Sequence, residues 1–341
     1  MSKGNFIGYV TSSDILSYPE NGEKDGFYYE RIKVNEGTYA WRVSESWTSV
    51  STLPYDFYNG CAVVYKDEIH ILGSYDSSGY TNHYKYNTTS NAWTNVSTLP
   101  YQFFSGSAVV YNNEIHIMGG YGGDSTEHYK YDSTSDEWTS VSTLPYEFIY
   151  GSAVVYNNEI HIMGSDNSSY STSHYKYNGS TWTSVSTLPY NFNTGSAVVY
   201  NNEIHILGGY GGEWTEHYKY DSTSDEWTNV STLPYYFYDG SAVVYNNEIH
   251  ILGGVGGDDL TEYYKYNSTS NTWTSVSTLP YSFYGGCAIV YNNEIHIMGS
   301  EDNYDMHYKY VENIVGYVVS NKSSAFPSSG TQDGKIYERI E

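Results

Sequence analysis

The sequence predicts an all-β protein, a six-bladed β-propeller, on three observations. A tryptophan recurs every 44 to 46 residues, and its six copies are Trp47, Trp93, Trp138, Trp182, Trp227 and Trp273. Each period contains four short apolar or alternating segments separated by turn residues, the pattern of a four-stranded blade. The 341 residues include 32 Gly and 43 Tyr but only 16% charged residues, which is typical of a turn-rich β protein.

One copy of the repeat shows how the four strands, named A to D, follow from the residues. In the second copy they fall at 108–111, 114–118, 128–131 and 138–142. Asn112-Asn113 makes a two-residue turn between A and B, and Gly119-Gly120 ends B. Strand D stops at Leu144-Pro145, because proline has no N–H to donate to a ladder.

The Gly-Gly pair after strand B and the tryptophan that opens strand D resemble the kelch repeat. The resemblance extends over residues 47–310 and implies a kelch-like propeller. Three copies depart from it, with Gly73-Ser74, Gly164-Ser165 and Gly299-Ser300 in place of Gly-Gly. We expect a second small residue to be sufficient at these positions.

The order of the strands predicts how the ring closes. Six A–B–C units begin near residues 60, 106, 151, 195, 240 and 286. The first D strand, 47–53, precedes all of them, and the last unit ends at Tyr310 with no D strand behind it. We therefore expect the N-terminal D strand to complete the sixth blade, which removes an open sheet edge.

The segments that flank the repeats are related to each other. Residues 6–32 and 314–340 align without a gap and share 12 identities in 27 positions. Each copy is expected to form two short strands, and the two copies to pack together or onto the propeller. The predicted domains are an N-terminal β module with its connector (1–46), the propeller (47–310) and a C-terminal β module (311–341).

These end modules resemble short modules in structural and tail proteins of phages that infect Gram-positive bacteria. The resemblance implies attachment to a larger assembly, with other tail proteins as partners. The alternative is a pair of strand-like caps with no binding role.

Charge and hydropathy exclude several classes of partner. The formal charge of −24 disfavours nucleic acid, since phosphate binding requires Lys and Arg. No apolar run approaches 18 residues, so we expect no membrane insertion. The first residues lack the apolar core of a secretory signal, so the protein is expected to be made in a cytoplasm.

The residues that carry chemistry elsewhere are part of the repeat here. All eleven histidines lie at two repeat positions, with Tyr263 in place of a twelfth. A catalytic site must break the sixfold symmetry, and no histidine does, so we expect no enzyme and no cofactor. Some kelch-fold enzymes are copper oxidases, but the asymmetric histidine pair that copper requires is missing. Glu114 and Lys130, equivalent in every blade, are predicted to pair across strands.

The two cysteines and the acidic loops each allow more than one interpretation. Cys61 and Cys287 share one repeat position in the first and last blades. Either they form a disulfide or both are free thiols, and we expect free thiols, because equivalent inner strands are too far apart. Asp258-Asp259 is a candidate for Ca²⁺, but the acidic loops lack regular ligand spacing, so we predict no metal site.

Variation between the copies gathers in two sets of loops. The D–A loops are 55–59, 101–105, 146–150, 190–194, 235–239 and 281–285. The B–C loops are 74–82, 121–127, 166–173, 210–216, 255–262 and 301–306. Strands alternate in direction, so both sets emerge on one face, whereas the Asn-Asn turns lie on the other. A constant scaffold with one varied surface is typical of a recognition protein; the alternative is drift in solvated loops.

The varied positions mix tyrosine with small polar and acidic residues, as antibody paratopes do. The predicted ligand-binding face consists of Asp56, Tyr58, Asn59, Gln102, Phe104, Tyr121, Glu147, Tyr150, Asn191, Asn193, Tyr210, Trp214, Tyr236, Tyr238, Asp239, Asp258, Tyr284 and Tyr304. Neither loop set contains Lys or Arg, so an anionic ligand is not expected. The invariant phenylalanine of each D–A loop, Phe148 among them, is predicted to hold the loop in place.

These observations favour a non-enzymatic recognition protein. The most specific hypothesis is a phage tail receptor-binding component, located in the virion, that recognises a bacterial surface glycan or protein through the varied face. The alternative is a cytoplasmic kelch scaffold for protein–protein interaction, and an enzyme ranks third.

Overall fold

The computed structural model describes residues 21–24, 27–35, 38–43, 46–76, 79–167, 171–212, 214–256, 260–311 and 314–319, with side chains from Trp47 to Tyr310. These residues form strands, turns and loops and contain no helix, hence none long and apolar enough to cross a membrane. The chain divides into two compact units, Thr48–Lys309 and a second unit formed by Met1–Trp47 with Tyr310–Glu341.

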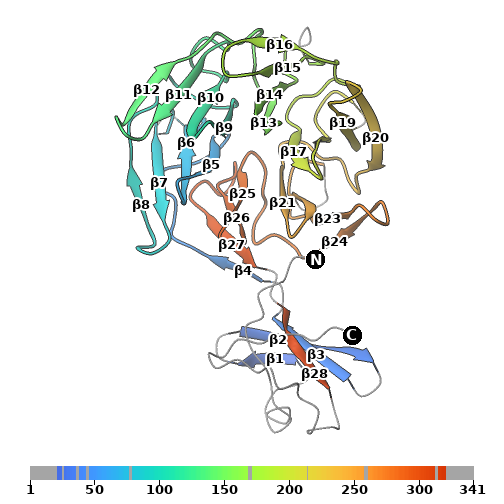
Figure 1. Ribbon diagram of the computed structural model, residues 1–341. Coiled ribbons are helices and arrows are strands. Elements are labelled where there is room, and N and C mark those ends of the chain that lie inside the picture. Colours follow the sequence, from blue (N-terminus) through green and yellow to red (C-terminus); the bar gives the residue numbers. More distant parts are fainter. Residues whose placement is uncertain are drawn as a thin grey trace, which may run out of the picture. The chain divides into compact units, whose positions relative to one another are not determined.

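Six antiparallel four-stranded sheets form the blades of a ring, which confirms the predicted six-bladed propeller (Figure 1). The innermost strands, at position A, are β5 (Cys61–Tyr65), β9 (Ser107–Tyr111), β13 (Ser152–Tyr156), β17 (Ser196–Tyr200), β21 (Ser241–Tyr245) and β25 (Cys287–Tyr291). At position B are β6 (Glu68–Leu72), β10 (Glu114–Met118), β14 (Glu159–Met163), β18 (Glu203–Leu207), β22 (Glu248–Leu252) and β26 (Glu294–Met298). Blades are numbered one to six from these inner strands.

The outer half of each blade consists of strands C and D. At position C are β7 (His83–Asn87), β11 (His128–Asp132), β15 (His174–Tyr177), β19 (Glu216–Asp221), β23 (Tyr263–Asn267) and β27 (His307–Val311). At position D are β8 (Ala92–Asn95), β12 (Glu137–Ser140), β16 (Trp182–Ser184), β20 (Glu226–Thr232), β24 (Thr272–Ser275) and β4 (Ser46–Ser49). The side chains of strand B are buried along most of its length because neighbouring blades pack against it, whereas D is largely exposed to solvent.

Ring closure follows the prediction. Strand β4 is the fourth strand of the sheet β25-β26-β27-β4, so the N-terminal segment completes blade six. The Val50 N–H donates to the carbonyl of His307 at 2.8 Å, as Val96 does to His83 within blade one. The last blade therefore has no open outer edge at β27.

Short turns fix the register within each blade. Asn112 and Asn113 both have positive φ, 49° and 61°, as a two-residue type I′ hairpin turn requires. Asparagine tolerates this left-handed conformation better than most residues, which explains why the pair recurs. Lys66 and Asp67 adopt the same turn in blade one.

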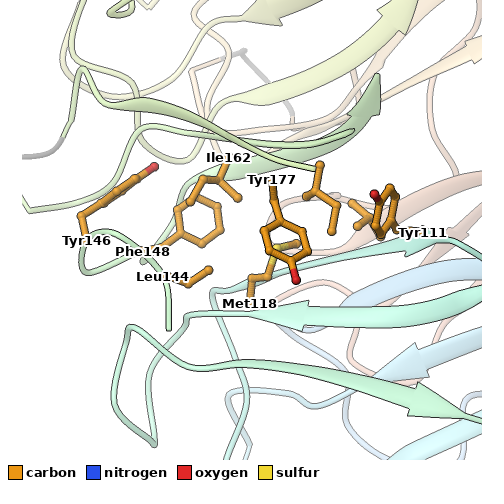
Figure 2. Close-up of a cluster of buried hydrophobic side chains, with 9 residues drawn as sticks. Tyr111, Met118, Leu144, Tyr146, Phe148, Ile162 and Tyr177 are labelled. Carbon is orange, nitrogen blue, oxygen red and sulfur yellow. The ribbon is translucent and has the colours of Figure 1, made fainter. Parts of the chain in front are cut away.

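Neighbouring blades are held together by buried side chains. Between blades two and three, Val109, Tyr111 and Met118 pack against Ile160, Ile162 and Tyr177 (Figure 2). Leu144 and the D–A loop residues Tyr146 and Phe148 complete this cluster. The invariant phenylalanine is fully buried in all six loops, as predicted for a residue that holds the loop. Truncation of a fully buried phenylalanine to alanine typically lowers the free energy of unfolding by about 3–5 kcal/mol.

In the copies with Gly-Ser in place of Gly-Gly, a side-chain hydrogen bond from the serine holds the same local structure. Gly120 of a Gly-Gly pair has a φ of 85°, where a side chain would be strained. Ser74 avoids positive φ, is fully buried, and donates its hydroxyl to the carbonyl of Asp56 at 2.7 Å. A second small residue is therefore sufficient at this position.

The described residues of the second unit form an antiparallel sheet in the order β1-β2-β3-β28. Its strands are β1 (Asn21–Lys24), β2 (Phe27–Asn35), β3 (Thr38–Val43) and β28 (Ile314–Val319). Pairing of β28 with β3 places segments from both ends of the chain in one sheet. Most of the aligned positions in 6–32 and 314–340 lie outside the described residues. That each copy forms two strands, and that the copies pack together or onto the propeller, stays a prediction.

Candidate ligand-binding face

The D–A and B–C loops interlock on one face of the ring. Each D–A phenylalanine donates its N–H to the B–C loop of the preceding blade, as Phe57 does to Tyr304 at 3.0 Å. The first varied residue of each B–C loop donates to the D–A loop beside it, as Tyr75 does to Tyr58 at 2.7 Å. The diversified segments therefore lie together, as the alternation of strands predicted, and we call this surface the varied face.

At the centre of the varied face the backbone forms a closed ring of hydrogen bonds. A glycine precedes each inner strand, and the residue before that glycine takes part in the ring. Its N–H donates to the carbonyl of the equivalent residue in the preceding D–A loop, at 2.7–2.8 Å in all six cases. We call these residues the hub ring: Asn59, Ser105, Tyr150, Thr194, Asp239 and Gly285. All six have φ between 52° and 64°. The same backbone therefore presents five different side chains and one glycine around the axis.

Glycine at the sixth hub position makes room for an aromatic ring. A Cβ on Gly285 would lie 2.1 Å from Cε2 of Tyr58. Real Cβ atoms do not approach so closely, so a larger residue would force the Tyr58 ring to move. Gly285 thus determines where Tyr58 lies.

A cavity of about 520 Å³ opens on the varied face beside the hub ring. It is lined by Tyr58, Asn59, Tyr75, Phe104, Tyr121, Tyr150 and Glu301, and we call it the aromatic pocket. These residues come from the loops of blades one, two, three and six. The volume falls within the range typical of small-molecule sites.

The rings of the aromatic pocket form a continuous arc. Tyr58 meets Tyr75 edge to face at 6.0 Å, and Tyr75 meets Phe104 edge to face at 5.1 Å. Phe104 stacks on Tyr121 at 5.5 Å, and Tyr121 meets Tyr150 at 6.0 Å. Such contacts stabilise ring positions beyond simple burial, so the wall of the pocket is preorganised.

The charge at this site is negative. Tyr58 donates its hydroxyl to Oε2 of Glu301 at 3.1 Å, and burial together with this carboxylate raises the pKa of Tyr58. Burial, and next the charge of Glu301, raises the pKa of Asp239 to about 6. Since neither loop set contains Lys or Arg, no basic side chain of the loops offsets these acids.

The structure distributes the predicted site residues over several places. Tyr58, Asn59, Phe104, Tyr121 and Tyr150 line the aromatic pocket, and Asp239 lies on the hub ring. A second aromatic cluster contains Tyr210, Trp214, Tyr236 and Tyr238, with Tyr210 stacked on Trp214 at 5.5 Å.

The remaining predicted residues lie around these two clusters. Asp56, Gln102, Glu147 and Asn191 are exposed, and Asn193 is buried. Tyr304 meets Tyr58 edge to face at 6.4 Å, and Tyr284 donates its hydroxyl to Asp302. Asp258 lies outside the described residues.

Two pocket residues, Tyr75 and Glu301, were not in the predicted set. Both occupy the repeat position that follows the Gly-Gly or Gly-Ser pair, the position of Tyr121 and Tyr210 in other blades. This equivalence was the signal that would have identified them.

The histidines form buried hydrogen-bonded pairs within the blades. In five blades the strand B histidine pairs with the strand C histidine, as His116 Nδ1 does with His128 Nε2 at 2.8 Å. In blade five, His250 Nδ1 bonds the Tyr263 hydroxyl at 2.8 Å instead. All eleven are buried inside the blades, and burial lowers the pKa of His116 to about 4.

The glutamate–lysine pairs and the two cysteines are arranged as predicted. Glu and Lys pair across strands B and C in all six blades, as Lys130 does with Glu114 at 3.0 Å. Cys61 and Cys287 are free thiols; each donates to a backbone carbonyl of the next blade. Among the described residues, no group of three His, Cys, Asp or Glu side chains is placed to hold a metal ion.

The architecture and the varied face together define a six-bladed β-propeller, a fold suited to binding and protein-interaction roles. No protein-family model matches the sequence, and neither does any curated protein. Solved structures do match: the chain is similar to the structure of YjhT with a TM-score of 0.66, covering 80% of this chain and 100% of that chain. At 15% identity this likeness shows the fold alone.

Proposed function

We propose that this protein is a non-enzymatic recognition protein that binds its ligand on the varied face, with the aromatic pocket at the centre of the contact. The observation that carries the proposal is the position of the pocket. Its walls come from segments that differ between the copies, while the strands and the Asn-Asn turns are nearly constant. Variation confined to a preorganised aromatic surface is the arrangement that recognition proteins use.

The chemistry of the face narrows the class of ligand. Exposed Tyr75 and Tyr121 offer aromatic contact area, and Asn59 and Glu301 offer hydrogen-bonding groups. Such a surface suits sugar rings and protein side chains and disfavours anions, which need Lys or Arg. The more specific proposal is a phage tail component that binds a glycan or protein on a bacterial surface; it is supported by the end modules' resemblance to phage proteins.

A cell-adsorption assay tests both the proposed binding through the varied face and the proposed bacterial target. Fluorescently labelled protein is incubated with a panel of Gram-positive bacteria, and the bound fraction is compared with that of Tyr121→Ala. The matched control is Lys66→Asn, which restores the first asparagine of the usual turn on the opposite face. We expect Tyr121→Ala to lose adsorption and Lys66→Asn to keep it. Equal adsorption by all three proteins would refute binding through the varied face, and adsorption to no strain would refute the bacterial target.

A further inference from the structure

The aromatic pocket has an unusual lining for a site that would bind only neutral sugars. Five of its seven residues are aromatic: Tyr58, Tyr75, Phe104, Tyr121 and Tyr150. The two others are the amide of Asn59 and the carboxylate of Glu301. The lining offers few hydrogen-bonding groups to a sugar hydroxyl, whereas an arc of rings beside a void favours a cation, which the negative ring faces attract. Phe104 is itself stacked on both Tyr80 and Tyr121, so it supports the arc. The rings open to a ligand include Tyr75 and Tyr121.

Acidic groups strengthen this preference. Glu301 lies at one end of the arc of rings, held by the hydroxyl of Tyr58 at 3.1 Å. Asp239 on the hub ring is close enough to Glu301 for the two charges to interact. Both acids therefore contribute a negative potential near the pocket.

The basic residues of the propeller are arranged so that they do not cancel this potential. Each strand C lysine is paired with a strand B glutamate inside its own blade, as Lys85 is with Glu68 at 2.9 Å. Lys66, the remaining lysine between residues 47 and 310, lies on the opposite face in an A–B turn and contacts Ser133. A cation that enters the pocket therefore meets acids and aromatic rings, and no lysine of the propeller, residues 47–310, lies beside it.

From this geometry we propose that the aromatic pocket binds a quaternary ammonium group, of the trimethylammonium type found in choline, carried by the ligand of the varied face. A quaternary ammonium has no N–H groups, so it needs no ring of acceptors and gains its binding free energy from aromatic contact and from nearby carboxylates. The proposal rests on the proposed function and specifies the chemistry of the group that the same pocket recognises.

Calorimetric titration of the full chain with choline tests the proposal. The matched probe is 3,3-dimethylbutan-1-ol, which has the same shape as choline but no charge. We expect saturable one-to-one binding of choline and at least about tenfold weaker binding of the neutral isostere, the range that a desolvated cation–π site gives. Equal affinities for the two probes, or no saturation with choline up to about 10 mM, would overturn the proposal.

Variants separate the contributions of ring and charge. Tyr58→Phe keeps the ring and should leave choline affinity within about threefold, whereas Tyr58→Leu removes it and should weaken binding about tenfold. Glu301→Gln removes the charge but keeps an acceptor for Tyr58, and should also weaken choline binding. Lys66→Asn, on the other face, should have no effect. Equal affinity in Tyr58→Leu and wild type would place choline elsewhere and contradict the proposal.

The two proposals fail in distinguishable ways. If Tyr121→Ala reduces cell adsorption but choline does not bind, the ammonium inference is wrong while recognition through the varied face stands. If choline binds in the pocket but no bacterial strain is adsorbed, the pocket chemistry is supported and the bacterial target is wrong.

Discussion

The hydroxyl of Tyr58 donates a hydrogen bond to Oε2 of Glu301 across 3.1 Å, although 243 residues separate the two in the chain. Tyr58 lies in the loop that enters blade one, and Glu301 lies in the B–C loop of blade six. The bond therefore depends on ring closure by β4. Closure of the fold and assembly of the aromatic pocket are consequently the same structural event.

Substitution of Gly285 tests the placement of Tyr58. A Cβ at this position would lie 2.1 Å from the Tyr58 ring, so Gly285→Ala should displace the ring and weaken ligand binding about tenfold or more. The chain should still fold, because the other five hub positions carry side chains on the same left-handed backbone. Thermal unfolding and choline titration measure the two effects.

A double variant provides the control for Gly285→Ala. Replacing Tyr58 by Ala as well relieves the clash, so the double variant should be more stable than the sum of the two single changes predicts. Additive free energies of unfolding would show that the ring and the new methyl group do not meet.

Titration of Asp239 gives a prediction for stability against pH. Burial, and then the charge of Glu301, raises its pKa from 3.8 to about 6; Tyr58, Tyr150 and Tyr238 also face it. The folded state therefore binds more protons than the unfolded state between these two pH values. The stabilisation from this proton is fully present below pH 3.8 and is lost as the pH rises through about 6.

The variant Asp239→Asn removes this dependence. It should be more stable than the wild type at pH 7.5 and about equally stable near pH 3.5, as measured by urea unfolding. The same offset at both pH values would contradict a raised pKa at this position.

The histidine pairs predict loss of stability in acid. Burial lowers the pKa of His116 to about 4 and that of His128 to about 3, below the ordinary value of 6.5. The unfolded chain thus binds more protons below pH 6.5, and the free energy of unfolding falls as the pH decreases. Each such group contributes about 1.4 kcal/mol per pH unit within its window.

Blade five supplies a natural design for testing one pair. Tyr263 replaces the strand C histidine there and keeps a 2.8 Å bond to His250. His128→Tyr should therefore fold, retain its stability at pH 7.5 within about 1 kcal/mol, and unfold at a lower pH than the wild type in circular dichroism. An unchanged pH midpoint of acid unfolding would show that the His116–His128 pair does not cause the loss of stability in acid.

Two aromatic residues of the loops should separate effects on stability from effects on binding. Phe148 is fully buried between blades two and three, so Phe148→Ala should cost about 3–5 kcal/mol. Tyr121 is 38% exposed, so Tyr121→Ala should cost less than about 1 kcal/mol but impair ligand binding. Denaturant unfolding and titration of both variants measure the contrast; the reverse pattern would mean that Tyr121 is a structural residue.

The repeat made the fold predictable from the sequence. Local signals sufficed: the Asn-Asn turns, the Pro that ends strand D and the spacing of tryptophans determine four strands per period. The count of strands then required β4 to close blade six. The Glu–Lys pairs were also predictable, since residues on adjacent strands meet whenever the register is set by a short turn.

The number of blades, their closure and the face on which the variable loops emerge were predictable from the residues, because each follows from local turns and from counting. Which varied side chains meet depends on how the six blades pack around the axis. Of the eighteen predicted site residues, five line the aromatic pocket, and Tyr75 and Glu301 join them. Sequence spacing could not show this, because the pocket forms where blades one, two, three and six meet. Its shape depends on contacts across the ring, such as the room that Gly285 leaves for Tyr58.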